Sequence, residues 1–212
     1  TRPGLMNAHW HLRYTHMAGQ PPPPRLFPDW TLLIITIKSD CGRADFARSW
    51  VAGADMLLRS GVTTVMDIEA RPELLPEVWP QTQLRLISCA ELISVRRLEA
   101  VAELVDGTVA RLGGIVDPVK RVGLSPHAPY STSADLLERA ATAVRGRSWP
   151  VTIHIAESAD EFEMFMYRRG PMFDWLKPQR SMDDCGLGSP VRHVGAAGLL
   201  GPNCVAVHVN YL

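Results

Sequence analysis

Short apolar runs recur along the chain at intervals that suit β-strands. Each run is rich in β-branched or aliphatic residues and ends at a polar or turn-forming residue, as strands commonly do. The pattern predicts six strands, at residues 4–9, 62–68, 84–92, 122–125, 151–156 and 204–209.

Between these runs, apolar residues recur at the three- and four-residue spacing of an amphipathic helix. One such stripe covers residues 46–58 and is followed by Gly61, a residue that often ends a helix. A second covers residues 98–112. Both stripes predict helices that pack one face against the strands.

Two further helices are indicated by their first residues. Thr132 or Ser133 can cap a helix whose apolar positions fall within residues 136–144. Ser158, with Glu161 three residues later, fits a capping box and predicts that a helix begins directly after the fifth strand.

Residues 19–29 are expected to form a loop, because the four consecutive prolines at 21–24 favour an extended segment without backbone donors. The apolar run at 32–37 has the length of a strand or a short helix.

Strands that alternate with amphipathic helices indicate βαβ units and a parallel sheet. An open doubly wound sheet and a closed barrel both fit six such strands. No glycine-rich phosphate loop follows the first strand, which argues against the nucleotide-binding form of the open sheet. We therefore predict an α/β fold in one domain, residues 1–212, built as a partial TIM-type (β/α)8 barrel with strands one to six and their helices.

Composition excludes several classes of partner. Of the 212 residues, 22 are Lys or Arg and 22 are Asp or Glu, so the formal net charge is zero. A protein that binds nucleic acid or an anionic membrane surface usually carries a basic excess. No apolar stretch approaches the roughly 18 to 20 residues of a membrane span. We expect a small-molecule ligand, with no nucleic acid or membrane partner and with a homo-oligomer left open.

The four cysteines are scattered and form no CxxC pair. A zinc ribbon or a disulfide framework is therefore not expected, and the reducing cytoplasm fits best. We interpret the cysteines as small, mostly buried apolar residues.

Five of the seven histidines fall at or near the carboxyl ends of the predicted strands, where parallel barrels place their active sites. His9 and His11 are two residues apart, so both imidazoles point to one face of an extended strand. Such a pair can bind one divalent metal, although two polar loop histidines would give the same short motif.

His154 lies in the otherwise apolar fifth strand, where an unpaired imidazole would be costly. It is either a metal ligand or a core histidine bonded to a backbone carbonyl. Glu157 follows it and suits proton transfer, or is a solvated residue near a helix N-terminus. His208 in the sixth strand has the same alternatives as His154. His127, in a loop between two prolines, contacts a substrate or caps a turn.

His16 and His193 end no strand and are expected on the surface or in loops.

These motifs, in this order, resemble the metal-dependent amidohydrolase superfamily, in its branch of hydrolytic deaminases and chlorohydrolases. The resemblance rests on residues 3–12 (PGLMNAHWHL), 61–65 (GVTTV), 125–131 (SPHAPYS), His154 with Glu157, and 208–212 (HVNYL). It runs from one end of the chain to the other. Residues 9–19 also resemble the start of aminodeoxyfutalosine deaminases.

The resemblance implies a role for each matched position. His9, His11 and His154 would hold one divalent metal, zinc or iron. Glu157 would move a proton between an activated water and the leaving group, and His208 would orient that water. His127 would contact the substrate. The family implies hydrolytic deamination of an aminated purine-, pyrimidine- or triazine-like ring.

Two features depart from the family pattern. Two-metal members use a bridging lysine or glutamate, and the position is filled here only by Glu91 as a weak candidate, so a single metal is expected. The family also supplies an aspartate ligand from an eighth strand and usually carries a β-sandwich, and the sequence contains neither.

Three hypotheses therefore stand at this point. The chain is a metal-dependent deaminase, a dechlorinating or amide-cleaving hydrolase of the same fold, or a catalytically incomplete fragment that acts as a binding module.

Overall fold

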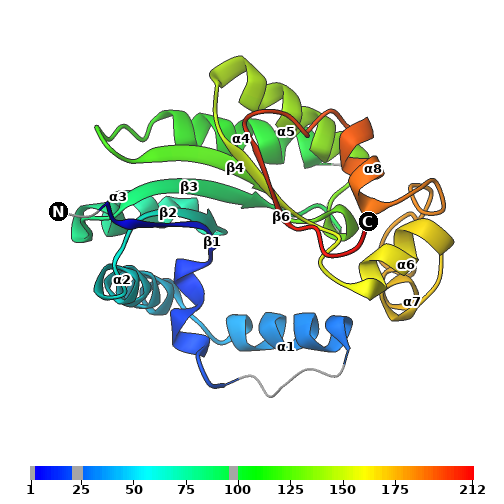
Figure 1. Cartoon of the computed structure of the whole chain (residues 1–212), viewed down its shortest axis with the longest axis horizontal. Coiled ribbons are helices and arrows are strands. Elements are labelled where there is room, and N and C mark those ends of the chain that lie inside the picture. The colour runs from blue at the N-terminus through cyan, green and yellow to red at the C-terminus, as the bar shows by residue number, and fades with distance from the viewer. Residues whose placement is uncertain (1–2, 21–25, 96–99) are drawn as a thin grey trace.

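A computed structural model of the chain describes residues 3–20, 26–95 and 100–212. Its six strands form one sheet in the order β1 to β6, and every neighbouring pair is parallel (Figure 1). The strands are β1 (Leu5–Trp10), β2 (Val62–Glu69), β3 (Arg85–Leu92), β4 (Arg121–Pro126), β5 (Val151–Ile155) and β6 (Cys204–His208). All six predicted strands are confirmed, and no strand end differs from its prediction by more than one residue.

Helices connect consecutive strands, as parallel pairing requires. They are α1 (Phe27–Ser39), α2 (Arg43–Arg59), α3 (Leu75–Val78), α4 (Val101–Gly113), α5 (Ala134–Arg147), α6 (Ala159–Tyr167), α7 (Pro171–Leu176) and α8 (Pro190–Ala196). A 3-10 segment, η1 (Leu12–Met17), follows β1 directly, and a shorter one, η5 (Pro129–Ser131), follows β4. None of the described helices is both long enough and apolar enough to cross a membrane.

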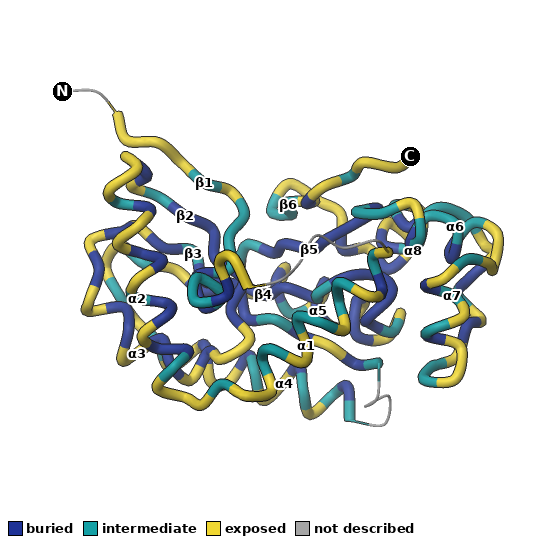
Figure 2. Tube along the Cα trace, turned by 90° about the horizontal axis from the view of Figure 1, so that it is seen from below, coloured by how far each residue is buried: buried dark blue, intermediate teal, exposed yellow. Residues whose placement is uncertain are grey.

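The main core lies between the sheet and helices α2, α4 and α5. Leu57 of α2, Leu112 of α4 and Leu137 of α5 are buried against side chains of the central strands. Every residue of β5 is buried, whereas no residue of β1, at the edge of the sheet, is fully buried (Figure 2). The apolar runs of the central strands are thus explained by their coverage on both faces.

The predicted helix ends agree well with the structure. The 46–58 stripe lies within α2, and Gly61 has φ of +86°, a conformation that glycine adopts without strain. Ser133 is the cap of α5 and accepts a hydrogen bond from the amide of Leu136. Residue 98 of the second stripe and the prolines at 21–24 lie outside the described residues.

Two local predictions need correction. The prediction of a loop over residues 19–29 is wrong at its end, because α1 begins at Phe27. Pro28 lies in the first turn of this helix, where a missing N–H costs little. Ser158 caps α6 as predicted, but Glu161 does not complete the capping box. Its carboxylate instead accepts hydrogen bonds from the amides of Ala156 and Glu157, at 3.0 and 2.9 Å.

Candidate metal centre

Five histidines meet at the carboxyl ends of β1, β4, β5 and β6. His9 lies in β1 and His11 directly after it. The other three are His127 after β4, His154 in β5 and His208 at the end of β6. The ring centroid of His154 lies 4.9 to 5.5 Å from the ring centroids of the other four. Residues up to 199 positions apart in the sequence therefore share one site.

The predicted ligands His9 and His11 each have a ring nitrogen close to one of His154. Ring nitrogens of His9, His154 and His208 are all within 4.8 Å of each other. The Nε2 atoms of His11 and His154 are 3.3 Å apart. His208, which was expected to orient a water, is thus as much a part of the donor cluster as the three expected ligands.

The imidazoles are held in the neutral form that a metal requires. Burial, followed by the nearby His208, lowers the pKa of His9 to about 4. Burial and the neighbouring His127 lower the pKa of His154 to about 3. Burial and the charge of Arg13 hold the pKa of His11 well below its usual value. At neutral pH each ring therefore offers a lone pair.

Hydrogen bonds fix which nitrogen of His154 carries its proton. Its Nδ1 lies 2.7 Å from the carbonyl oxygen of His127, which can only accept, so Nδ1 donates and Nε2 keeps the lone pair. The buried Nδ1 atoms of His9 and His11 have no hydrogen-bond partner among the described residues. Neutral rings with buried, unpartnered nitrogens fit a divalent cation such as zinc or iron.

The structure bears out the carbonyl-bonded alternative for His154, and this bond is compatible with metal binding through the other ring nitrogen. His154 is a buried histidine bonded to a backbone carbonyl, and the same bond turns its other nitrogen toward the cluster. Trp10, between His9 and His11, packs against the main core.

Glu157 lies beside the cluster, with its Oε1 3.4 Å from Nε2 of His208. Burial raises the pKa of Glu157 to about 7. A carboxyl group with a pKa near neutrality can both accept and return a proton.

The backbone at this rim is unusual. Ala156, His208 and Val209 have φ of +50°, +71° and +51°, in the left-handed region that residues other than glycine rarely adopt. The conformation persists because the amides of Val209 and Asn210 are bonded to the carbonyls of Ile155 and Ala156. Strained backbone of this kind is common where side chains are positioned for function.

A buried ion pair supports the segment after β1. Arg13 is 1% exposed, and its guanidinium donates to Glu91 at 2.9 Å, to the hydroxyl of Tyr14 at 2.7 Å and to the carbonyl of Ile68 at 2.5 Å. Burial alone would raise the pKa of Glu91, but Arg13 outweighs burial and lowers it to about 2.

The pairing with Arg13 argues further against Glu91 as a bridge between two metals, a role for which the sequence offered it only as a weak candidate. Its carboxylate is already used in a salt bridge, with a side chain that is 4% exposed. Sequence reasoning missed Arg13, since a lone arginine in a polar segment is usually solvated.

Asp67, near the carboxyl end of β2, fixes the backbone next to His11. Its Oδ1 accepts from the amide of Leu12 at 2.9 Å, and its Oδ2 accepts from Trp50 Nε1 at 3.2 Å. Sequence reasoning missed Asp67 as well, although its place at the end of a strand is the signal that found the histidines.

His16 and His193 do not join the cluster, as expected, but neither is a free surface residue. His16 Nδ1 is 2.9 Å from Ser49 Oγ. His193 packs against Phe165 and lies 3.7 Å from Asp184. Both side chains are partly buried.

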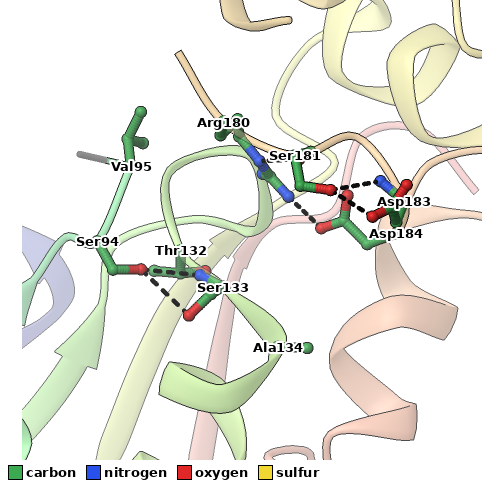
Figure 3. Close-up of a pocket in the computed structure, with 9 residues that line it drawn as sticks. All are labelled: Ser94, Val95, Thr132, Ser133, Ala134, Arg180, Ser181, Asp183 and Asp184. Carbon is green, nitrogen blue, oxygen red and sulfur yellow. Dashed lines mark hydrogen bonds and ion pairs between the residues drawn. The ribbon is translucent and has the colours of Figure 1, made fainter. Parts of the chain in front are cut away.

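A separate cavity of about 160 Å³ lies between the end of β3, the start of α5 and residues 180–184 (Figure 3). None of the five clustered histidines lines it. Arg180 on its wall donates to the carbonyls of Pro129 and Tyr130 and pairs with Asp184. The charges of Arg180 and Asp184 on the wall of this cavity are therefore already paired within the protein.

Comparison with known proteins agrees with this geometry. The chain is 29% identical over 169 residues to an aminodeoxyfutalosine deaminase of Deinococcus radiodurans, covering 74% of this chain and 40% of that protein. It is 27% identical over 216 residues to a 5-methylthioadenosine/S-adenosylhomocysteine deaminase of Syntrophobacter fumaroxidans, covering 97% and 44%. The chain thus spans less than half the length of these relatives.

Solved structures share the fold. A zinc-bound adenosine deaminase from Xanthomonas campestris superposes with a TM-score of 0.70 at 23% identity, covering 97% of this chain and 44% of that one. A zinc complex of an atrazine chlorohydrolase from Arthrobacter aurescens superposes with a TM-score of 0.73 at 17% identity, covering 95% and 47%. These likenesses confirm the partial (β/α)8 barrel. The amidohydrolase family matches residues 2–200, and the chain belongs to that family.

Proposed function

We propose that the protein is a metal-dependent hydrolase that removes an amino group from a nucleoside-like heterocycle. One observation carries the proposal: four strands bring five neutral imidazoles and a carboxyl group of near-neutral pKa together at the carboxyl end of the sheet. The substrate class is favoured because the relatives named above deaminate adenosine-type compounds.

We assign His9, His11 and His154 as the residues that hold the metal, which is zinc in two of the structural neighbours. A bound divalent cation supplies a water that is acidic enough to act as a nucleophile near neutral pH. The short distances among these rings and the lone pair directed by the His127 carbonyl support this assignment. His208 orients the water or joins the ligands.

Glu157 is assigned to proton transfer. Its carboxylate takes a proton from the attacking water and gives it to the departing amino group, so that a C–O bond forms, a C–N bond breaks and ammonia leaves. His127 faces the same space as His154 and is assigned to the substrate, with its own Nδ1 held 2.7 Å from Ser131 Oγ. We place the enzyme in the cytoplasm, since its four cysteines are free.

The test is a product assay on zinc-loaded protein. Adenosine-type nucleosides, aminated pyrimidines and a chlorinated triazine would be supplied in parallel, with ammonia and chloride both measured. Ammonia from the nucleosides supports the proposal. Chloride release from the triazine, without ammonia, would favour the dechlorinating alternative. Protein that binds zinc but converts no substrate would favour the binding-module hypothesis.

A further inference from the structure

A second histidine site lies apart from the metal cluster, where η1 meets α2. The Sγ atom of Cys41 is 3.2 Å from Nε2 of His16. Cys41 lies between Asp40, the residue that caps α1, and Gly42, the cap of α2, and its side chain is partly exposed. A thiol in contact with an imidazole is the arrangement in which a histidine can accept the thiol proton.

The hydrogen bonds of His16 determine its tautomer. Ser49 Oγ donates its hydrogen to the carbonyl oxygen of Arg13 at 2.8 Å. Nδ1 of His16 lies 2.9 Å from Ser49 Oγ and 3.1 Å from the same carbonyl, so both neighbours of Nδ1 are acceptors. Nδ1 must therefore carry the proton of the neutral ring, which leaves the lone pair of Nε2 facing the sulfur of Cys41.

The His16 ring is also held in place by packing. Its edge meets the ring of Phe46 at a centroid distance of 6.0 Å, and its backbone amide donates to Ser49 Oγ at 3.0 Å. Nucleophile, base and orienting hydroxyl thus come from three elements: the α1–α2 connection, η1 and α2. If Cys41 only filled space as a small side chain, the direction of the His16 Nε2 lone pair toward its sulfur would be unexplained.

The surroundings make the thiol depend on this base. Partial burial, together with the carboxylates of Asp45 and Asp40, raises the pKa of Cys41, so little thiolate forms there by simple ionisation. Reaction at neutral pH then requires a neighbour that accepts the proton as the sulfur attacks. Among the described residues, the sulfur contacts two acceptors, Nε2 of His16 at 3.2 Å and the carbonyl oxygen of Ile37 at 3.5 Å, and only the imidazole is basic enough to remove the proton.

We propose that His16 activates Cys41 as a nucleophile toward low-molecular-weight disulfides, which makes Cys41 a site of reversible mixed-disulfide formation. The thiol proton passes to His16 Nε2 while the Cys41 sulfur attacks one sulfur of the disulfide. A new S–S bond forms, the original S–S bond breaks, and the departing thiolate takes the proton. The Cys41 sulfur is oxidised and the departing sulfur is reduced.

The experiment exposes the whole chain to glutathione disulfide at pH 7.5 and follows adduct formation by peptide mass mapping. We expect Cys41 to be modified first, ahead of Cys204, the other partly exposed cysteine, and ahead of the buried Cys89 and Cys185. His16→Gln should slow modification of Cys41 by about 10- to 100-fold, the usual contribution of a general base. His193→Gln is the matched control and should leave the rate unchanged.

Two further measurements separate loss of the base from loss of the fold. At pH 10 the rate of His16→Gln should approach that of the unmodified sequence, because hydroxide then removes the thiol proton. In urea all variants should react alike. The proposal is overturned if Cys204 reacts first, if no cysteine forms an adduct, or if His16→Gln reacts at the original rate at pH 7.5.

Discussion

Oε1 of Glu157 lies 3.4 Å from Nε2 of His208, across the gap between the ends of β5 and β6. The pair joins a carboxyl group whose pKa lies near 7 to the imidazole cluster. Glu157 is therefore positioned for proton transfer, and the neighbouring imidazole rings are positioned for metal binding.

The first prediction separates these two tasks. Glu157→Gln should keep zinc binding, because the five imidazoles remain, but should lower the rate of ammonia release by about 10²- to 10⁴-fold, the usual contribution of general acid–base catalysis. Zinc content and turnover would be measured on the same preparation. Glu163→Gln, an exposed glutamate on α6, is the control and should retain both. Loss of zinc in Glu157→Gln would show that Glu157 acts as a ligand.

The second prediction concerns the ion pair between Arg13 and Glu91. Arg13→Met leaves the Glu91 carboxylate buried without its partner, and should lower the free energy of unfolding by about 3–5 kcal/mol. Urea unfolding measures the change. The double variant Arg13→Met/Glu91→Gln removes the stranded charge and should recover part of this loss. If the two substitutions lower stability additively, the buried pair is not coupled as described.

The third prediction concerns Glu161. Burial raises its pKa from 4.5 to about 8, although the amides of Ala156 and Glu157 oppose this shift. A raised pKa in the folded state means that this contribution to stability is complete below about pH 4.5 and is lost as pH rises through 8. Glu161→Gln cannot titrate, so its unfolding free energy should fall less between pH 5 and pH 8.

Unfolding in urea at several pH values between 5 and 8 gives the two slopes to be compared. Parallel slopes for Glu161→Gln and the unmodified chain would show that the folded state holds Glu161 in its charged form throughout this range. Glu138→Gln, on the exposed face of α5, is the control and should leave the slope unchanged.

Much of the fold could be predicted from the sequence. Fully buried strands such as β5 appear as short runs rich in β-branched residues, and caps such as Ser133 act through local hydrogen bonds that a few residues determine. The prediction failed at α1, where prolines suggested a loop, although Pro28 lies in the first turn of a helix and breaks no bond there.

The candidate site was predictable where chemistry and strand ends coincide. His9, His127 and His208 were found because titratable residues at the ends of parallel strands converge. The ion pair between Arg13 and Glu91 was missed, because it spans 78 positions and no local pattern reveals it. The direction of the His154 lone pair depends on the hydrogen bond from its Nδ1 to the carbonyl oxygen of His127. The position of that carbonyl is set only when the backbone has folded.

The central claim is that His9 and His154 bind the metal. The decisive measurement is zinc content, by elemental analysis after loading and dialysis, for the unmodified chain and for His9→Ala, His154→Ala and the control His193→Ala. The account predicts about one zinc per chain in the unmodified and control proteins, and a marked loss in His9→Ala and in His154→Ala. Unchanged zinc in both of these variants would contradict it.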